Sequence, residues 1–108
     1  MAKRKIDVGL KKTIETYIAK ISQYFEIDAV YLFGSSVKGG THKDSDIDLA
    51  IVSSSVKDRI EDNGKLFALT WDIDTNIEPH LFRTEDFNRK DTIMVDEILR
   101  TGIQVYSM

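Results

Sequence analysis

Two short apolar segments joined by a loop of small and polar residues constrain this chain more than any other feature. Residues 28–33 read Asp-Ala-Val-Tyr-Leu-Phe, and residues 46–52 read Asp-Ile-Asp-Leu-Ala-Ile-Val. Both segments are rich in β-formers, so we expect two buried strands with residues 34–45 as the loop between them. Alternation along the second strand places one set of side chains on each face. One face carries Asp46, Asp48, Ala50 and Val52, and the other carries Ile47, Leu49 and Ile51.

Helical periodicity is found on either side of these strands. Apolar residues recur at spacings of three and four along residues 7–25, which predicts an amphipathic helix. A second helical pattern predicts a helix that packs closely against the sheet at its glycine. Its apolar positions are Ile60, Gly64, Phe67, Ala68 and Trp71. We expect the aromatic residues at these spacings, Tyr17, Tyr24, Phe67 and Trp71, to belong to the core. The run of Ser53, Ser54 and Ser55 is expected to turn the chain and cap a helix.

The remaining sequence predicts a third strand over residues 76–82, a helix over residues 91–101 and a short final strand over residues 103–106. Pro79 lacks a backbone N–H, which favours an edge position or a bulge for the third strand. Thr84 is placed to cap a short turn. Helices and strands in this order predict an α/β or α+β domain with a mixed sheet and helices packed on it. A chain of 108 residues fits a single domain, residues 1–108.

The composition excludes several classes of function. The chain has no cysteine, so disulfides, thiolate metal sites and cysteine nucleophiles are excluded. That absence fits a cytoplasmic protein. The net charge of −3 lacks the basic footprint of a protein that holds a long nucleic acid. No segment approaches membrane-spanning length, and no apolar run follows the basic N-terminus as a signal peptide requires.

Two carboxylates on one strand face need a physical reason. Asp46 and Asp48 are two residues apart along a strand, or about 6.6 Å. The side chains can converge further, and two unit charges about 6 Å apart repel by roughly 2.8 kcal/mol at an effective dielectric near 20. Either the carboxylates are fully solvated or a cation lies between them. Glu78, on the third strand, is the best candidate for a third carboxylate if that strand is a neighbour in the sheet. Carboxylates together with phosphate oxygens suit Mg²⁺, and such a site can hold a pair of ions.

The Gly-Ser pair at the end of the first strand completes a plausible phosphate site. Gly34 lets the backbone turn sharply and lets a phosphate approach closely. Ser35 offers a hydroxyl and a backbone N–H, and Lys38 offers positive charge. A plain strand, turn and strand with a polar loop is the alternative. Gly-Ser alone is a weak signal, whereas Gly-Ser, ten residues and then Asp-Ile-Asp at the start of an apolar strand is a strong one.

This pattern resembles the signature of the nucleotidyltransferase superfamily related to DNA polymerase β, and in particular its minimal single-domain members. The resemblance rests on Gly34-Ser35, on Ser45-Asp46-Ile47-Asp48-Leu49, and on Ile77-Glu78-Pro79 as the strand of the third acid. Lys38-Gly39 stands where these proteins usually have Arg-Gly, which loses bidentate phosphate contact but keeps the charge.

The resemblance implies transfer of a nucleoside monophosphate, AMP from ATP in the favoured case, to a hydroxyl with Mg²⁺ as cofactor. It implies that Asp46, Asp48 and Glu78 are the catalytic and metal-binding acids. It implies that Gly34, Ser35, Lys38 and Ser45 hold the nucleotide. Members of the group often pair with a small helical partner protein of the HEPN type in toxin–antitoxin systems. Some adenylylate that partner. A homo-oligomer is left open.

Several alternatives remain open at this stage. Asp72 or Asp74 is the fallback for the third acid, while His80 either lines the site or is a satisfied polar group beside the sheet. His42 is expected to be an exposed loop residue. The protein can also be a non-catalytic binding module that neutralises a helical partner by occlusion. Transfer to a small molecule such as an antibiotic ranks last, because enzymes of that kind usually carry an additional acceptor domain.

Overall fold

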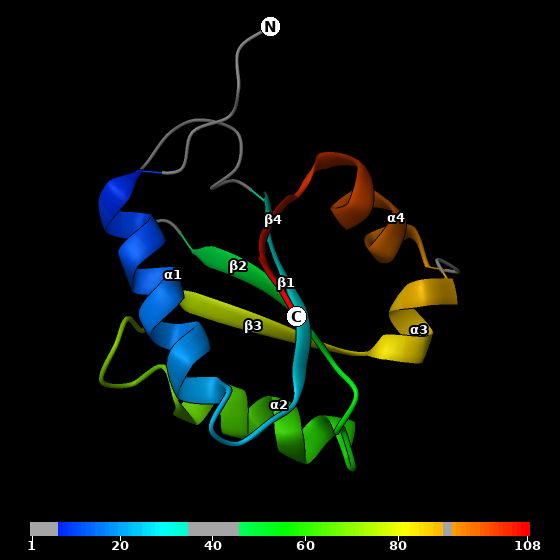
Figure 1. Cartoon of the computed structure of the whole chain (residues 1–108), viewed down its shortest axis with the longest axis horizontal. Coiled ribbons are helices and arrows are strands. Elements are labelled where there is room, and N and C mark those ends of the chain that lie inside the picture. Colours follow the sequence, from blue (N-terminus) through cyan, green and yellow to red (C-terminus); the bar gives the residue numbers. More distant parts are fainter. Residues whose placement is uncertain (1–6, 35–45, 90–91) are drawn as a thin grey trace, which may run out of the picture.

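A four-stranded mixed sheet forms the centre of the protein. The computed structural model describes residues 7–34, 46–89 and 92–108. The strands are β1 (Ile27–Phe33), β2 (Ile47–Ser53), β3 (Ile77–Arg83) and β4 (Ile103–Ser107). Their order in the sheet is β3-β2-β1-β4, with β1 antiparallel to β2 and β4, and β2 parallel to β3 (Figure 1). The expected mixed sheet is therefore confirmed.

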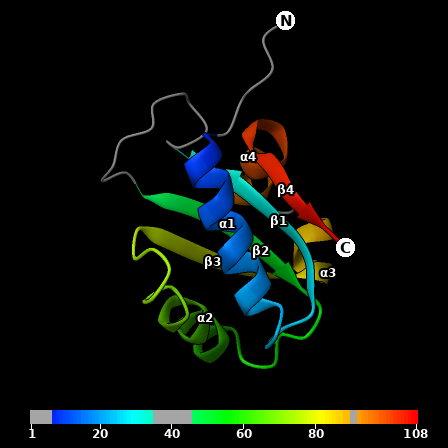
Figure 2. The ribbon, with the colours of Figure 1, turned by 60° about the vertical axis from the view of Figure 1, so that its left-hand side comes forward.

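Helices cover both faces of this sheet. They are α1 (Val8–Ile21), α2 (Arg59–Ala68), α3 (Thr84–Arg89) and α4 (Ile93–Thr101). Side chains of α1 and α2 pack with Ile47, Leu49 and Ile51 in the larger core cluster. Side chains of α3 and α4 pack with Ala50 and Val52 in the smaller one. The two views of the ribbon show α1 and α4 on opposite sides of the sheet (Figures 1 and 2). The predicted alternation along β2 is confirmed. Within the described ranges no helix is both long and apolar enough to cross a membrane.

The first helix is shorter than predicted. Asp7 caps its N-terminus by accepting hydrogen bonds from the backbone N–H groups of Gly9 and Leu10. The helix ends at Ile21 instead of residue 25, and the chain then turns into β1. Phe25 stays buried beyond the end of the helix, whereas Tyr24 is exposed, against the expectation that it belongs to the core. The apolar pattern continued past the helix because the turn also packs on the core.

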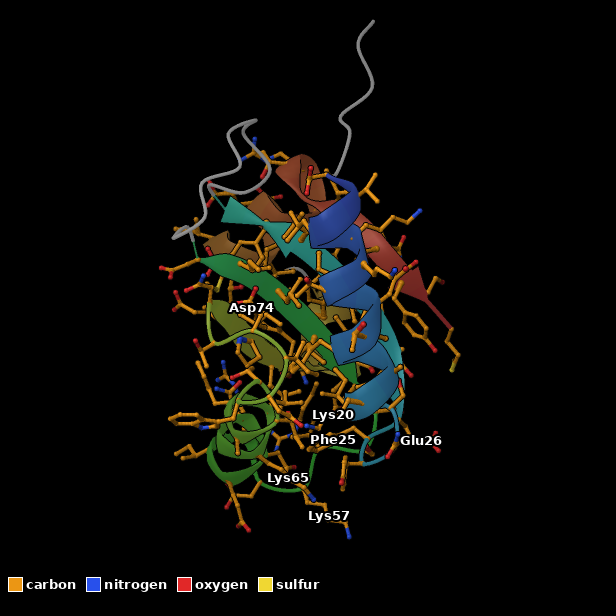
Figure 3. The ribbon with its side chains drawn as sticks, turned by 90° about the vertical axis from the view of Figure 1, so that its left-hand side faces the viewer. Lys20, Phe25, Glu26, Lys57, Lys65 and Asp74 are labelled. Carbon is orange, nitrogen blue, oxygen red and sulfur yellow. The ribbon has the colours of Figure 1, made fainter. Side chains whose placement is uncertain are left out.

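Contacts between α1 and α2 fix these two helices on the same face. Tyr17 is fully buried, as predicted, and its hydroxyl donates a hydrogen bond of 2.7 Å to the carbonyl of Leu66. The ammonium group of Lys65 lies over the ring of Tyr24, 4.7 Å from its centroid. In Figure 3, Lys65 and Phe25 mark the place where the end of α1 meets α2. A buried hydroxyl needs such a partner, since an unpaired one costs about 1–3 kcal/mol.

The second helix turns its apolar stripe outward, and the predicted orientation is wrong. Ile60 is 87% exposed, and Trp71, which lies in the turn after the helix ends at Ala68, is 79% exposed. A Cβ atom on Gly64 would meet nothing within 4 Å, so the helix does not approach the sheet there. Phe67 is also exposed, and the buried contact of the helix is made by Leu66. The side of the helix that carries Leu66 faces the core. With 3.6 residues per turn, this side lies opposite the apolar stripe.

Polar side chains of α2 tie it to the edge of the sheet. The side-chain oxygen of Asn63 accepts a 2.9 Å hydrogen bond from the backbone N–H of Leu81. The Nε of Arg59 donates to the carbonyl of the same residue at 3.2 Å. Strand β3 is an edge strand, as Pro79 predicted. Both backbone groups of Leu81 are therefore paired, although none of the described strands lies beyond β3.

The three consecutive serines do not cap a helix. Asp58 caps α2 by accepting from the backbone N–H groups of Ile60 and Glu61. Ser53 instead ends β2, and its buried hydroxyl donates to the carbonyl of Glu26 at 2.7 Å. The hydroxyl oxygen of Ser55 accepts from the N–H of Glu26 at 3.0 Å. These bonds join the start of β1 to the end of β2, so the prediction that the serines cap a helix is wrong.

Candidate metal and nucleotide site

Parallel pairing of β2 and β3 brings acidic side chains from distant parts of the chain together. Asp48 is the register partner of Glu78, and Ala50 is the partner of His80. Residues that pair across neighbouring strands point to the same face of the sheet. This face carries the smaller core cluster, which begins only at Ala50. Asp48, Glu78 and His80 are thus partly exposed at one end of that face.

Three side chains at this end lie within reach of one ion. Asp48, Glu78 and His80 each offer a ligand atom, and these atoms all lie within 4.8 Å of one another. The Nε2 of His80 is 3.2 Å from Oδ1 of Asp48. The exposed fractions of these two side chains are 32% and 23%, so both are shielded and yet accessible from solvent. Among the described residues this is the only such group of three.

Asp46 joins this group through Glu78. A side-chain hydrogen bond with Asp46 is the main reason that the pKa of Glu78 is raised above its usual value. Burial and the negative charges of Asp46 and Asp48 raise this pKa further, while His80 lowers it. A cation bound between such neighbouring carboxylates would favour their charged forms. Asp46 itself is exposed, immediately before β2.

Gly34 is in contact with the acidic group from the other side. It follows β1, whose last residue, Phe33, is the register partner of Asp48. Its φ of +80° lies in the left-handed region, which glycine adopts at little cost. A Cβ atom at this position would be 2.5 Å from Oδ2 of Asp48. Glycine is therefore required here both for the turn and for the room that the carboxylate occupies.

The ring of His80 is held in place from a second side. It packs against the ring of Phe33 edge to face, with the centroids 5.2 Å apart. The sequence left open whether His80 lines the site or is a satisfied polar group beside the sheet. The signal in the sequence was its spacing of two from Glu78, which puts both on one strand face. His80 lies close to Asp48 because β3 and β2 are neighbours in the sheet, and the spacing within one strand does not predict which strands are neighbours.

The fallback acids lie away from the group. Asp72 forms an ion pair with Lys20 of α1, and this pairing lowers the pKa of the carboxyl. Asp74 accepts a 2.8 Å hydrogen bond from the N–H of Asn76 and so shapes the turn before β3. Neither belongs to the group of three ligand atoms. The predicted nucleotide-binding residues Ser35, Lys38 and Ser45, and also His42, lie outside the described residues.

A groove runs beside the acidic group, between α2 and α4. It has a volume of about 300 Å³, and His80 lines it together with Ile60, Phe82 and Met94. Arg59 and Asn63 of α2 also line it, so the groove is mixed, with polar and apolar side chains. A chain with carboxylates and an imidazole next to such a groove can hold a divalent cation at one place and an organic group beside it.

The donor set fits a divalent metal ion. Carboxylate oxygens are the ligands that Mg²⁺ prefers. The pKa of Glu78 is raised mainly by its hydrogen bond with Asp46 and by burial, and the smaller contribution from the charges of Asp46 and Asp48 is one that a cation would relieve. An ion with open coordination positions at an exposed site can also bind the oxygens of a phosphate.

Comparison with known proteins gives a family for this arrangement. Residues 15–108 match the sequence profile of the family described as Polymerase beta, Nucleotidyltransferase. No curated protein matches the chain at a significant level.

Solved structures with the same fold include bacterial and archaeal proteins. A candidate nucleotidyltransferase from Sulfolobus solfataricus is 18% identical, with a TM-score of 0.65 over 93% of this chain and 82% of that one. A toxin–antitoxin structure with AMP-PNP is 23% identical, with a TM-score of 0.57 over 91% of this chain and 73% of that one. The complex of a tri-AMPylated Shewanella oneidensis HEPN toxin with an MNT antitoxin contains a chain that is 22% identical, with a TM-score of 0.53 and the same coverage.

Proposed function

The chain belongs to the polymerase beta nucleotidyltransferase family, and we propose that residues 1–108 act as one domain that transfers AMP from ATP to a hydroxyl group of a partner protein. The partner is a small helical protein of the HEPN type, and this chain is the antitoxin of the pair, located in the cytoplasm. The observation that carries the proposal is the register that pairs Asp48 with Glu78 and gathers three ligand atoms within 4.8 Å.

The acids have distinct parts in this proposal. Asp46 and Asp48 would hold Mg²⁺, and Glu78 would complete the site or accept the proton of the acceptor hydroxyl. The bound cation supplies neutralisation of the triphosphate charge. The hydrogen bond of Glu78 with Asp46 and its place beside Asp48 support either role.

The transfer itself is a displacement at phosphorus. The acceptor oxygen forms a bond to the α-phosphorus, the bond from that phosphorus to the β-phosphate oxygen breaks, and pyrophosphate leaves. The proton of the acceptor hydroxyl passes to a carboxylate of the site. Gly34, Ser35, Lys38 and Ser45 are proposed to hold the triphosphate. The positive φ of Gly34 supports that role, since it turns the chain away from β1 at the carboxylate of Asp48.

The outward face of α2 supports a protein as the acceptor. Ile60 and Phe67 of α2, together with Trp71 in the turn after the helix, are exposed apolar side chains, which we call the α2 stripe. A single exposed apolar side chain is ordinary, but three from one helix and the turn after it, one of them a tryptophan, support an interaction surface. Ile60 also lines the groove that reaches His80, so the stripe and the acidic group are connected through one surface. A partner bound on the stripe is thereby brought close to the candidate site.

The α2 stripe also favours a second function. A binding module that neutralises its partner by occlusion needs an interaction surface and no chemistry. The two functions differ in whether neutralisation depends on the carboxylates.

The test uses the purified chain, ATP labelled at the α-phosphate, Mg²⁺ and a small helical protein of the HEPN type, the class of partner that the proposal names. We expect label on the partner with the wild-type chain and none with the double variant Asp46→Asn/Asp48→Asn. Both proteins are first compared by circular dichroism and by binding to the partner, so that lost transfer is not lost folding. Equal labelling by the two chains, or none by either, would overturn the proposal.

A cellular assay separates transfer from occlusion. The same double variant is expressed with the partner, and growth is measured. Under the proposed function the variant binds the partner and fails to protect the cells. Full protection by a variant without transfer activity would establish the binding module instead.

A further inference from the structure

We propose that His80 is a direct ligand of the metal ion held by Asp48 and Glu78, and that this site therefore prefers a first-row divalent transition ion such as Mn²⁺ over Mg²⁺. The inference rests on the proposed function, because it concerns the metal of the same site. It differs from an all-carboxylate site in both the ligand set and the ion it selects.

The geometry of the two side chains fits two adjacent ligands. Ligands at right angles on an ion with bonds of about 2.1 Å lie about 3.0 Å apart. The Nε2 of His80 and Oδ1 of Asp48 are 3.2 Å apart. One ligand atom from each of Asp48, Glu78 and His80 lies within 4.8 Å of the other two. The three donors can thus approach one ion by small rotations of their side chains, without a change in the sheet.

The ring of His80 is also positioned for this role before any ion binds. Phe33 packs against it edge to face, and the parallel register fixes its backbone next to Ala50 of β2. The other oxygen of Asp48 points toward Gly34, where a Cβ would be 2.5 Å away, so Oδ1 is the atom directed to the imidazole. A preorganised ligand loses little side-chain entropy on binding.

The kind of donor decides the preferred ion. Carboxylates and water suit Mg²⁺, whereas an imidazole suits transition ions, and affinity rises along the first row from Mn²⁺. A donor set of Asp48, Glu78 and His80 combines hard oxygens with one imidazole nitrogen. Removing the imidazole should therefore weaken Mn²⁺ binding more than Mg²⁺ binding.

The alternative role for His80 is a hydrogen bond that orients Asp48, and one substitution separates the two. His80→Gln keeps an N–H group that can donate to Asp48, but an amide nitrogen is not a metal ligand. Affinities for Mn²⁺ and Mg²⁺ are measured by calorimetry on the full chain, without nucleotide or partner. Since even groups outside the ligand set are worth roughly 10–100-fold in affinity, we expect the Mn²⁺/Mg²⁺ ratio to fall about tenfold or more in the variant.

A second measurement leaves His80 in place. The chain has two histidines, so His42→Gln leaves His80 as the only imidazole in a ¹⁵N-histidine spectrum. Zn²⁺, a diamagnetic ion that imidazole binds well, is then added. Direct ligation moves the Nε2 resonance and leaves Nδ1 bearing the proton. A spectrum that Zn²⁺ does not change overturns the proposal.

The outcomes distinguish this inference from the proposed function. An unchanged Mn²⁺/Mg²⁺ ratio in His80→Gln, with AMP transfer by the wild type intact, overturns only the ligation by His80. A wild-type chain that binds neither ion overturns the metal site, and the proposed function with it. A ratio that falls together with a shifted Nε2 resonance supports the proposal.

Discussion

Gly34 and Asp48 approach each other so closely that no side chain fits between them. A Cβ atom at Gly34 would lie 2.5 Å from Oδ2 of Asp48, and the φ of +80° disfavours any other residue. We expect Gly34→Ala to lower the free energy of unfolding by about 1–3 kcal/mol. It should also displace the carboxylate and weaken metal binding. Denaturant unfolding and calorimetry with Mn²⁺ measure the two effects.

Gly64 provides the matched control for this substitution. It is exposed on α2, and a Cβ there would meet nothing within 4 Å. Gly64→Ala should therefore stabilise the protein by about 0.5–1 kcal/mol through helix propensity, with unchanged metal affinity. The predicted effect of the contact between Gly34 and Asp48 on metal binding would be contradicted if both variants lost metal binding or if Gly34→Ala lost none.

The raised pKa of Glu78 predicts how the stability of the metal-free protein depends on pH. A carboxyl whose pKa is raised by folding contributes stability below its unfolded pKa, near 4.3, and this contribution is lost as the pH rises through the folded value. Glu78→Gln is neutral at every pH and avoids this loss. Without metal, the variant should be the more stable protein at pH 7.

Denaturant unfolding from pH 4 to pH 7 checks this order. The stability advantage of Glu78→Gln over the wild type should grow across the range as Glu78 ionises. Saturating Mg²⁺ should then stabilise the wild type more than the variant, because an ion stabilises the form that binds it better. A constant difference between the two proteins across the pH range would contradict the prediction.

Tyr17 connects α1 to α2 through a buried hydroxyl. Tyr17→Phe removes its 2.7 Å bond to the Leu66 carbonyl and should cost about 1 kcal/mol of unfolding free energy. Burial raises the pKa of the Tyr17 phenol. Its contribution is therefore present below about pH 10, the usual tyrosine value, and is lost as the pH rises further. The wild type should lose stability in alkali more steeply than Tyr17→Phe. Parallel alkaline profiles for the two proteins would count against this.

The α2 stripe should matter for the partner and not for the fold. Ile60→Ser/Trp71→Ser should change the free energy of unfolding by no more than about 0.5 kcal/mol, since both side chains are exposed. Partner affinity should fall by about tenfold or more. Val8→Ser is the control, because Val8 is 82% exposed at the far end of α1 from α2 (Figure 1). Equal partner affinity in all three proteins would exclude the stripe as the interface.

The alternation of β2 was predictable from sequence because a strand with two covered faces must divide its side chains between them. The edge position of β3 was predictable because Pro79 removes a donor. The orientation of α2 was not predictable from sequence, because its apolar stripe lies on a different side of the helix from the one that packs on the protein. The polar residues Arg59 and Asn63 face the sheet, where they bind the backbone of Leu81. Periodicity identifies the helix but cannot reveal that polar side chains make the tertiary contact.

The individual residues of the candidate site could be predicted from the sequence, but the way in which the fold brings them together could not. Spacing alone put Asp46 and Asp48 on one strand face, and Glu78 with His80 on another. That the two strands are neighbours, and parallel, is a property of the whole sheet. The triad of Asp46, Asp48 and Glu78 stays a prediction. The group of three candidate ligand atoms adds His80 to Asp48 and Glu78, and Asp46 is joined to it by a hydrogen bond with Glu78.

The parallel pairing of β2 and β3 has a consequence for how the protein is made. Parallel neighbours require a crossover, and here α2 supplies it between residue 53 and residue 77. A nascent chain that has emerged only as far as β2 carries Asp48 without Glu78 or His80. It cannot gather the ion-binding atoms, whatever else has folded. The group of three candidate ligand atoms is thus complete only late in synthesis, once β3 has been made.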